Sequence, residues 1–270
     1  GTRQLLSHIH GNIGIITLNR PESKNALSDE LTPALRQQIS IFNTDKRVNS
    51  LIITGAGDAF CAGGDVKSMN SSKNKNEGWS KDQSDEETIK DLQVKQMTLT
   101  HVLYNFSKPT IAAIPGAAAG AGLSIALACD FRFVNENAFV IAGYGKIALT
   151  GDYGMSWLLP RIVGVPKAKD IMFSNKKIFA KEGLKICLFD NIIKGDNLLK
   201  STLEYANLLG SFSSFALKAM KKNINNSYQL NLEEALHQEA VELIKASKSN
   251  DHKEGIKAFI EKRKPNFVGN

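Results

Sequence analysis

Three short runs of β-branched and apolar residues set the main constraint on the fold. They are IGIITL from Ile13, SLIIT from Ser50 and TIAAI from Thr110, and a glycine or proline turn follows each of them. Each run is apolar on both faces, which is typical of strands that are covered on both sides. The chain therefore needs layers of other elements above and below these strands.

An amphipathic helix is predicted between the first two runs, in the segment SDELTPALRQQISIFN. Ser28 precedes an acidic first turn, and apolar side chains recur at helical spacing at Leu31, Leu35, Ile39 and Phe42. A helical crossover of this length between buried strands favours parallel pairing. The sequence therefore predicts an α/β fold with a largely parallel sheet.

Two turns that are almost free of side chains follow predicted strands. One is FCAGGDVK at residues 60–67, and the other is PGAAAGAGLSIALACD at residues 115–130, which opens onto an apolar helix. Small residues let backbone amides approach a ligand, and a helix N-terminus adds partial positive charge. Neither turn carries the phosphate-loop or dinucleotide fingerprint. Two such turns can each donate one amide to a single oxygen that gains negative charge during a reaction.

The second turn also contains GLSIA, which resembles a nucleophile elbow with Ser124 as the serine. Ala126 stands where that pattern closes on glycine. The histidines downstream are His237 and His252, both in a predicted exposed helical lobe. A serine hydrolase is therefore disfavoured.

Composition excludes several other classes of protein. With 42% hydrophobic and 23% charged residues among 270, the chain is expected to bury a core as an ordinary globular protein. The segment 110–129 is free of charge and long enough to span a membrane, but proline and glycines interrupt it and alanine dominates it. We expect no membrane span, no signal peptide and a cytoplasmic location.

Cysteines, histidines and charges give no evidence for a metal or a nucleic acid. Cys61, Cys129 and Cys187 are widely spaced in apolar surroundings, so we expect buried thiols in a reducing compartment. No histidine pair stands at zinc spacing beside cysteines. The net charge of +7 favours an anionic partner, but the basic residues are scattered and lack interleaved aromatic residues. We therefore expect an anionic small molecule as the partner.

The chain is predicted to have two parts. Residues 70–87 are nearly devoid of apolar side chains, so we expect a mobile loop or disordered insert that could lie over the first glycine turn. From about Asp196 the pattern is helical throughout. We predict a core at residues 1–195 and a helical oligomerisation lobe at residues 196–270.

Five segments, in this order, resemble the crotonase (enoyl-CoA hydratase/isomerase) family. They are LNRPESKNALS at 18–28, FCAGGDVKSM at 60–69, KPTIAAIPGAAAGAGLSIALACDFRF at 108–133, GKIALTGDYGMSWLLPRIVG at 145–164 and EGIKAFIEKRKPNF at 254–267. They cover nearly the whole chain. The resemblance implies a spiral core of repeated ββα units, a helical trimerisation lobe, and assembly as trimers or dimers of trimers.

The resemblance also implies an acyl-CoA thioester as substrate, with coenzyme A as part of the substrate and no separate cofactor. The thioester oxygen would lie between the backbone amides of Ala62 and Ala121. Lys24 matches a position that usually meets the nucleotide end of coenzyme A, although an exposed lysine is also an ordinary surface charge. Phe259 and Lys262 resemble a pair that reaches a neighbouring subunit's ligand. Further substrate contacts are implied at Ala26, Gly63, Gly64, Asp65 and Gly120.

Family membership leaves the reaction open. Hydratases of the family hold a water between two glutamates, and the corresponding positions here are Ser124 and Tyr144, neither of which is a carboxylate base. Asp152 matches the single acid of some enoyl-CoA isomerases. One carboxylate is sufficient to move a double bond, because it can remove a proton from C2 of a 3-enoyl thioester and return it at C4. We therefore predict an enoyl-CoA isomerase with Asp152 as the base.

Other roles stay open at this point. Asp152 could instead be the N-cap of the helix that follows it, since aspartate is favoured there. A hydratase would need Asp152 together with the hydroxyl of Ser124 or Tyr144 to hold the water. The absence of both glutamates also suits a protein that binds CoA thioesters with little turnover. Thioester hydrolysis and decarboxylation could use the same pair of amides.

Overall fold

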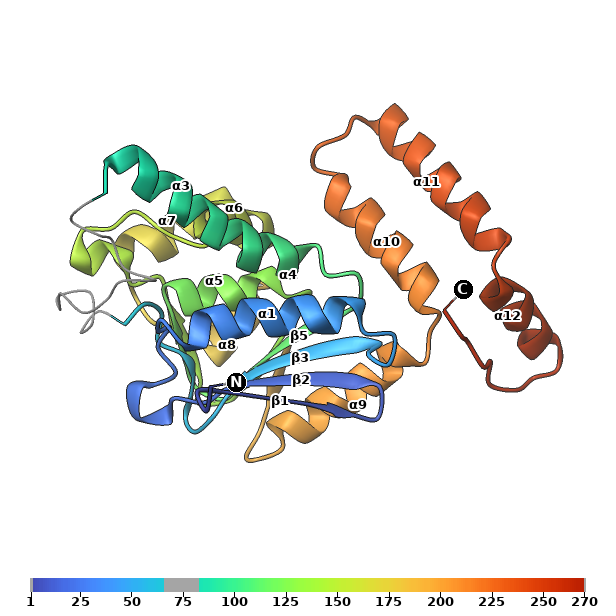
Figure 1. Cartoon of the computed structure of the whole chain (residues 1–270), viewed down its shortest axis with the longest axis horizontal. Helices are drawn as coiled ribbons and strands as arrows, with labels where there is room; N and C mark the ends of the chain where they lie inside the picture. The colour runs from blue at the N-terminus through green and yellow to red at the C-terminus, as the bar shows by residue number, and fades with distance from the viewer. Residues whose placement is uncertain (1, 66–82, 270) are drawn as a thin grey trace.

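The strands of two sheets form the centre of the computed structural model, which describes residues 2–65 and 83–269 (Figure 1). The larger sheet has six strands in the order β1 (Leu5–His10), β2 (Ile13–Leu18), β3 (Ser50–Gly55), β5 (Thr110–Ile114), β7 (Phe131–Asn135) and β10 (Asn191–Ile193). The smaller sheet has four, β4 (Ala59–Cys61), β6 (Ala117–Ala119), β8 (Phe139–Ile141) and β9 (Ile178–Phe179). Neighbouring strands are parallel except at the β1–β2 and β8–β9 pairs, so the predicted α/β class with largely parallel pairing is confirmed.

The chain alternates between the two sheets as it advances. A strand of the larger sheet is followed within a few residues by one of the smaller sheet, first as β3 and β4, then as β5 and β6, then as β7 and β8. A helical segment follows each of these pairs. This is the spiral of ββα units that the resemblance implied, and it brings the turns after β4 and β6 to the same edge of the smaller sheet, because β4 and β6 are parallel neighbours.

Helices cover both faces of the larger sheet. Those of the first two thirds of the chain are α1 (Leu31–Thr44), α3 (Asp85–Gln96), α4 (Val102–Tyr104), α5 (Ala121–Ala128), α6 (Met155–Val163), α7 (Val165–Ser174) and α8 (Ala180–Lys185). Short helical turns are η1 (Pro21–Ser23), the π-helical turn η2 (Met97–His101) and η3 (Tyr144–Ile147). The last four helices are α9 (Leu198–Gly210), α10 (Ser214–Asn226), α11 (Leu232–Ser247) and α12 (Asn250–Ile260).

Alternate residues of one strand enter different parts of the core. Ile16 of β2 belongs to the large cluster that includes the apolar face of α1, whereas Ile15 belongs to a second cluster with Leu198 and Ala206 of α9. Figure 1 shows α1 and α9 on opposite sides of the sheet. Each fully buried aliphatic side chain contributes about 1.5–3 kcal/mol. The prediction of strands apolar on both faces is therefore explained by helices on both sides.

Helix α1 is confirmed, with a correction at its start. The four side chains at helical spacing are all buried. The helix begins at Leu31, Glu30 takes the N-cap position without a side-chain bond, and the first turn contains no acidic residue. The hydroxyl of Ser28 nevertheless accepts a hydrogen bond from the Leu31 amide at 3.1 Å. Ser28 thus satisfies one amide of the helix end from outside the cap position.

The apolar segment before Asp130 is a buried strand, turn and helix, made of β5, β6 and α5. No helix in the described ranges is long and apolar enough to cross a membrane.

Three other expectations are adjusted. Ala117–Ala119, predicted within a turn, form β6; Cys187 is exposed, whereas Cys61 and Cys129 are buried. Ser84 caps α3 in a reciprocal capping box with Glu87, and most of the predicted loop at 70–87 lies outside the described residues.

The helical stretch after Asp196 is confirmed, but its helices have two different environments. Helix α9 packs on the larger sheet, where Tyr205 makes an edge contact with Phe131 at 5.1 Å between ring centroids. Helices α10, α11 and α12 extend away from the sheets as a separate arm (Figure 1). We call α10–α12 the C-terminal arm. The boundary between core and lobe at residue 196 stays a prediction.

Candidate active site

The two glycine turns meet, as the sequence predicted. A Cβ placed on Gly63 would lie 2.8 Å from the carbonyl oxygen of Ala119 and 3.4 Å from the amide nitrogen of Ala121. A Cβ on Gly122 would lie only 2.3 Å from the carbonyl oxygen of Cys61. Any side chain at these two positions would push the turns apart, and Gly63 also has a φ of 91° that favours glycine. The glycines are therefore required for the close approach of the two backbones.

The hydrogen bonds of the first turn correct the prediction for Ala62. Its amide donates to the carbonyl oxygen of Lys24 at 2.9 Å, so it is not available to a ligand. The Gly63 amide interacts with the Cys61 thiol and lowers its pKa, which burial raises overall to about 12. The next amide, that of Gly64, has no acceptor within the part of the chain that the structure describes, although Gly64 forms a bridge with Leu27. Gly64 is thus the residue of this turn that can donate outward.

The second turn provides the other amide. Ala121 is the first residue of α5, and its N–H has no acceptor among residues 2–65 and 83–269. The first amides of a helix lack partners within the helix and carry partial positive charge. Gly120 precedes it with a φ of 49°. The prediction that Ala121 offers an amide is consistent with this geometry, and the outward amide of the first turn is that of Gly64 instead of Ala62.

Asp152 lies beside α5 in the loop before α6. The hydroxyl of Ser124, one turn into α5, donates to the carbonyl oxygen of Asp152 at 2.8 Å, and the hydroxyl of Tyr144 reaches the same oxygen at 3.4 Å. That hydroxyl would also lie 3.9 Å from a Cβ on Gly120. The structure therefore brings Asp152, Ser124, Tyr144 and the second glycine turn together.

The carboxyl group of Asp152 is partly buried and held through one oxygen. Oδ1 accepts hydrogen bonds from Nε2 of Gln96 at 2.7 Å and from the Tyr153 amide at 2.6 Å. Burial raises the pKa of Asp152 above its usual range, and these two hydrogen bonds partly oppose the shift. Neither bond is an N-cap bond, because α6 begins at Met155 and Gly154 takes the cap position. The alternative role of Asp152 as an N-cap is therefore not observed.

The loop that carries Asp152 has an unusual backbone. Ala148, Gly151, Tyr153 and Gly154 all have positive φ, and Tyr153 at 49° is a bulky residue in the left-handed region. Such conformations persist when surrounding contacts hold them, and they cluster at functional sites. The Thr100 hydroxyl donates to the Tyr153 carbonyl at 3.0 Å. The loop is therefore fixed on both sides of the carboxyl group.

The two positions where hydratases carry glutamates hold hydroxyls whose bonds are already used. Ser124 is buried and donates to the loop backbone, so it has no histidine partner in the described chain and no nucleophile-elbow role. Burial raises the pKa of Tyr144 far above its usual value, so the phenol stays protonated as a donor. Both side chains position the Asp152 loop.

The residues implied to contact coenzyme A have mixed environments. Lys24 is exposed and its Nζ pairs with both carboxylate oxygens of Asp58 at 2.7 Å. Asp65 forms an ion pair with Arg20 at 3.2 Å, and Arg20 also donates to the carbonyl oxygen of Ala26 at 2.6 Å. Asp65 and Ala26 therefore brace the first glycine turn. An exposed ion pair such as Lys24–Asp58 is weak enough for a phosphate to compete with it.

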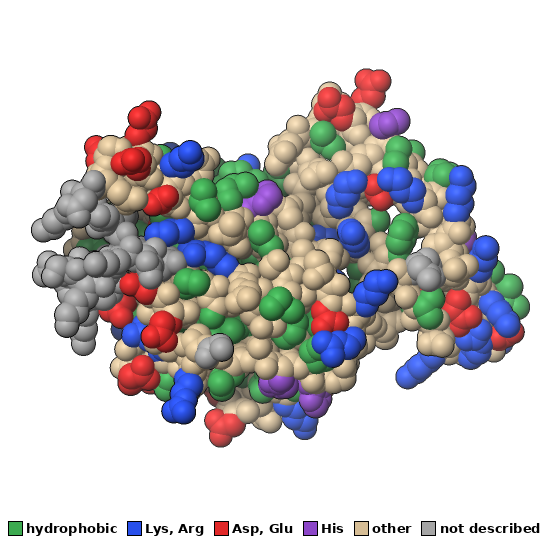
Figure 2. All heavy atoms as spheres, viewed as in Figure 1, with side chains coloured by type: hydrophobic (Ala, Val, Ile, Leu, Met, Phe, Trp, Pro, Cys, Tyr) green, Lys and Arg blue, Asp and Glu red, His purple; other side chains and the backbone are tan. Residues whose placement is uncertain are grey.

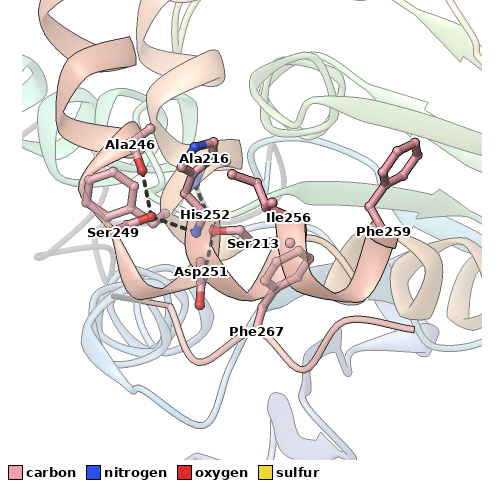
Figure 3. Close-up of a pocket in the computed structure, with 11 residues that line it drawn as sticks. Ser213, Ala216, Ala246, Ser249, Asp251, His252, Ile256, Phe259 and Phe267 are labelled. Carbon is pink, nitrogen blue, oxygen red and sulfur yellow. Dashed lines mark hydrogen bonds between the residues drawn. The ribbon is translucent and has the colours of Figure 1, made fainter. Parts of the chain in front are cut away.

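Phe259 lies in α12 of the C-terminal arm and Lys262 follows that helix, and Figure 1 shows α12 at the far end of the molecule from α6. The arm carries an open pocket of about 400 Å³ beside α12. Figure 3 shows Asp251 facing Ser213 within it, whereas Phe259 lies at its edge and is 84% exposed. Asp251 accepts from Ser213 at 2.6 Å and from the Val268 amide at 2.8 Å, which ties the C-terminal tail to α12. The structure does not bring this pair to the site of the same chain.

Other chemistry is sparse. No group of three histidine, cysteine or acidic side chains suited to a metal occurs among the described residues. Asp130 accepts from Thr110 and Lys221 and has a structural role. Gln96 is the contact that the sequence did not predict, because nothing in its local pattern shows that α3 reaches the Asp152 loop.

The two largely parallel sheets and the meeting of two glycine turns beside one partly buried carboxyl group define an α/β protein of the crotonase class. The chain belongs to the enoyl-CoA hydratase/isomerase family, whose sequence profile matches residues 8–270.

Individual relatives and solved structures agree with this assignment. The chain is 32% identical to a probable mitochondrial enoyl-CoA hydratase of Dictyostelium discoideum over 95% of the chain and 88% of that protein. It is 29% identical to the 1,2-epoxyphenylacetyl-CoA isomerase of Escherichia coli over 98% of both. The crystal structure of an enoyl-CoA hydratase from Bacillus anthracis superimposes with a TM-score of 0.90 at 28% identity, covering 99% of this chain and 100% of that one.

Proposed function

We propose that this acyl-CoA enzyme is an enoyl-CoA isomerase that moves a double bond from the 3 to the 2 position, with Asp152 as the base. The observation that carries the proposal concerns Ser124 and Tyr144, the two positions where hydratases of the family carry glutamates. Ser124 and Tyr144 both hold the backbone carbonyl of Asp152, so they are not free to hold a water for hydration. One carboxyl group beside two outward amides is what a proton shuttle along one face of a substrate requires.

The proposed reaction has two proton transfers and no net change in composition. The thioester oxygen accepts hydrogen bonds from the Gly64 and Ala121 amides, which favours negative charge on that oxygen. The Asp152 carboxylate removes the C2 proton, and the C2–H electrons delocalise into the dienolate. The protonated Asp152 then returns the proton to C4 while the carbonyl re-forms, leaving the double bond between C2 and C3. Coenzyme A is the part of the substrate that the protein binds, and it is unchanged by the proposed reaction.

The raised pKa of Asp152 suits both halves of this cycle. A carboxylate with an ordinary pKa is a weak base, whereas burial makes the charged form less favourable and the base stronger. The same shift keeps the proton on Asp152 long enough to be returned. Since the active form is the carboxylate, the rate is expected to rise with pH through this raised pKa.

Hydration is the second candidate, because some relatives of the chain are named as hydratases and others as isomerases. A short-chain-enoyl-CoA hydratase of Clostridium acetobutylicum is 31% identical, whereas the Escherichia coli relative is named for isomerisation. A binding protein with little turnover is the third reading.

A pair of absorbance assays separates these readings. We expect a 3-enoyl-CoA to gain the absorbance of a conjugated thioester and a 2-enoyl-CoA to keep it. Loss of absorbance with the 2-enoyl substrate would indicate hydration and contradict the proposal. If neither substrate changes its absorbance but a saturated acyl-CoA still binds by calorimetry, the protein binds CoA thioesters with little turnover.

We also propose that the chain works as a trimer or a dimer of trimers in the cytoplasm. The C-terminal arm exposes many apolar side chains, among them Ile224, Leu232, Leu243 and Ile260, and Figure 2 shows hydrophobic patches between basic side chains on the arm. Apolar surface of this extent favours burial against a partner. Sedimentation should give three or six times the 29.5 kDa of one chain. A monomer at micromolar concentration would contradict this, and Phe259 would then have no neighbouring ligand to reach.

A further inference from the structure

We infer that Gln96 is a positioning residue for the base: its amide group holds Oδ1 of Asp152 so that Oδ2 exchanges the proton with the substrate. The inference rests on the proposed isomerase function for its catalytic consequence. Nε2 of Gln96 and the Tyr153 amide both donate to Oδ1, at 2.7 and 2.6 Å. Oδ2 has no hydrogen-bond donor in residues 2–65 and 83–269.

The chemistry of the contact fixes its direction. An ionised carboxylate can only accept, and the amide of glutamine offers its NH₂ group as donor. Two donors on one oxygen favour negative charge there and leave the proton to bind at the other oxygen. A base that must take a proton from C2 and deliver it to C4 gains from having one fixed oxygen, because a rotating carboxyl group would lose alignment between the two transfers.

The backbone around Gln96 is arranged for this contact. Helix α3 ends at Gln96 and continues as the π-helical turn η2, a conformation that recurs at functional sites. Thr100, four residues later, donates to the carbonyl oxygen of Tyr153 at 3.0 Å. Two side chains of this segment therefore contact consecutive residues of the loop. Gln96 bonds to the side chain of Asp152, and Thr100 bonds to the backbone of Tyr153.

Gln96 holds the Asp152 carboxyl group through a neutral amide and not through a charged group. Among the described residues, the phenols of Tyr144 and Tyr153 face the loop, and Arg36 of α1 reaches the Tyr153 hydroxyl at 3.4 Å. Within residues 2–65 and 83–269, no charged side chain alters the pKa of Asp152; burial raises this pKa, and the bonds from Gln96 and the Tyr153 amide lower it. Gln96 is therefore the side chain whose replacement should change the basicity of Asp152.

The test measures the pKa of Asp152 directly, by carboxyl ¹³C NMR titration of the full-length protein without ligand, with Asp152→Asn to assign the signal. Gln96→Leu should raise this pKa by about 1–2 pH units, the usual effect of losing a hydrogen bond to a charged group. Gln96→Lys should lower it, because a cation favours the carboxylate. Gln93→Leu, a glutamine on the exposed side of the same helix, should leave it unchanged.

The activity of the same variants completes the test. The acid limb of kcat/KM should move in the same direction as the pKa, with kcat reduced in Gln96→Leu and KM little changed. Unchanged pKa values in both Gln96 variants, with folding intact by circular dichroism, overturn the inference even if the enzyme is an isomerase. Shifted pKa values in a protein without isomerase activity would instead remove the proposed function and leave the positioning contact standing.

Discussion

Replacing Asp152 with Asn should lower kcat for isomerisation of a 3-enoyl-CoA by about 10²–10⁴-fold, the usual contribution of a general acid–base group. Asparagine has nearly the same shape, and its carbonyl oxygen can still accept from Gln96 and from the Tyr153 amide. It cannot take the C2 proton. Because the proposed oxyanion donors are backbone amides of other residues, calorimetric binding of a saturated acyl-CoA should change little.

The matched control is Asp196→Asn, an exposed acid in the loop before α9, which should keep the full rate. An isomerase rate in Asp152→Asn equal to that of the natural chain would show that the base lies elsewhere. A loss of both catalysis and binding would indicate that Asp152 has a structural role only.

The same variant should be more heat-stable at neutral pH. The folded-state pKa of Asp152 is raised, so the stabilising contribution of this group is present at low pH and is lost as pH rises through the raised pKa. At neutral pH the partly buried carboxylate therefore reduces stability, and asparagine removes that effect. The gain in Tm should shrink on acidification to below the usual aspartate range, a trade between stability and activity seen at many active sites.

The strands and the first helix could be predicted because their signals are local. The runs that became β2, β3 and β5 are apolar on both faces, and α9 and α1 supply the layers that this pattern requires. The start of α1 was less predictable. Ser28 accepts a hydrogen bond from the Leu31 amide, so the predicted capping chemistry is confirmed, but Ser28 lies outside the cap position.

The residues of the candidate site also differ in whether the local sequence could predict them. Ala121, Ser124, Tyr144 and Asp152 lie in segments whose order and spacing carry the family resemblance, and the structure brings them together. The occupation of the Ala62 amide was not predictable, because it depends on how the chain at Lys24, itself in a left-handed conformation, crosses the first glycine turn. Short stretches of sequence do not determine such backbone contacts between distant segments.

Gln96 shows the same limit for side chains. Helix α3 is polar and has no buried residue, so its sequence gives no hydrophobic face from which to predict its packing. The π-helical turn that follows it, with Leu99 and Thr100 buried, ties it to the core. A contact that depends on this turn appears only once the tertiary structure is known.

Replacing Ala121 with Pro should reduce kcat by about 10²–10³-fold, the usual cost of removing one donor from an oxyanion site. Ala121 is the first residue of α5, where proline is well tolerated because that amide has no partner within the helix. The ring removes the N–H and places a carbon where the thioester oxygen would lie, so binding of the acyl-CoA should weaken as well. Both effects follow from the position of this amide, and neither requires α5 to unfold.

Asp85→Pro is the control, since it puts the same ring at the exposed first position of α3, away from the C-terminal arm. It should retain the isomerase rate, and both variants should keep a cooperative thermal transition. Full activity in Ala121→Pro would contradict the assignment of this amide and would leave Gly64 without the second donor that two converging turns require. Activity lost only in Ala121→Pro would locate the reacting oxygen at the junction of the turns, where glycine is required by the 2.8 Å and 2.3 Å approaches at Gly63 and Gly122.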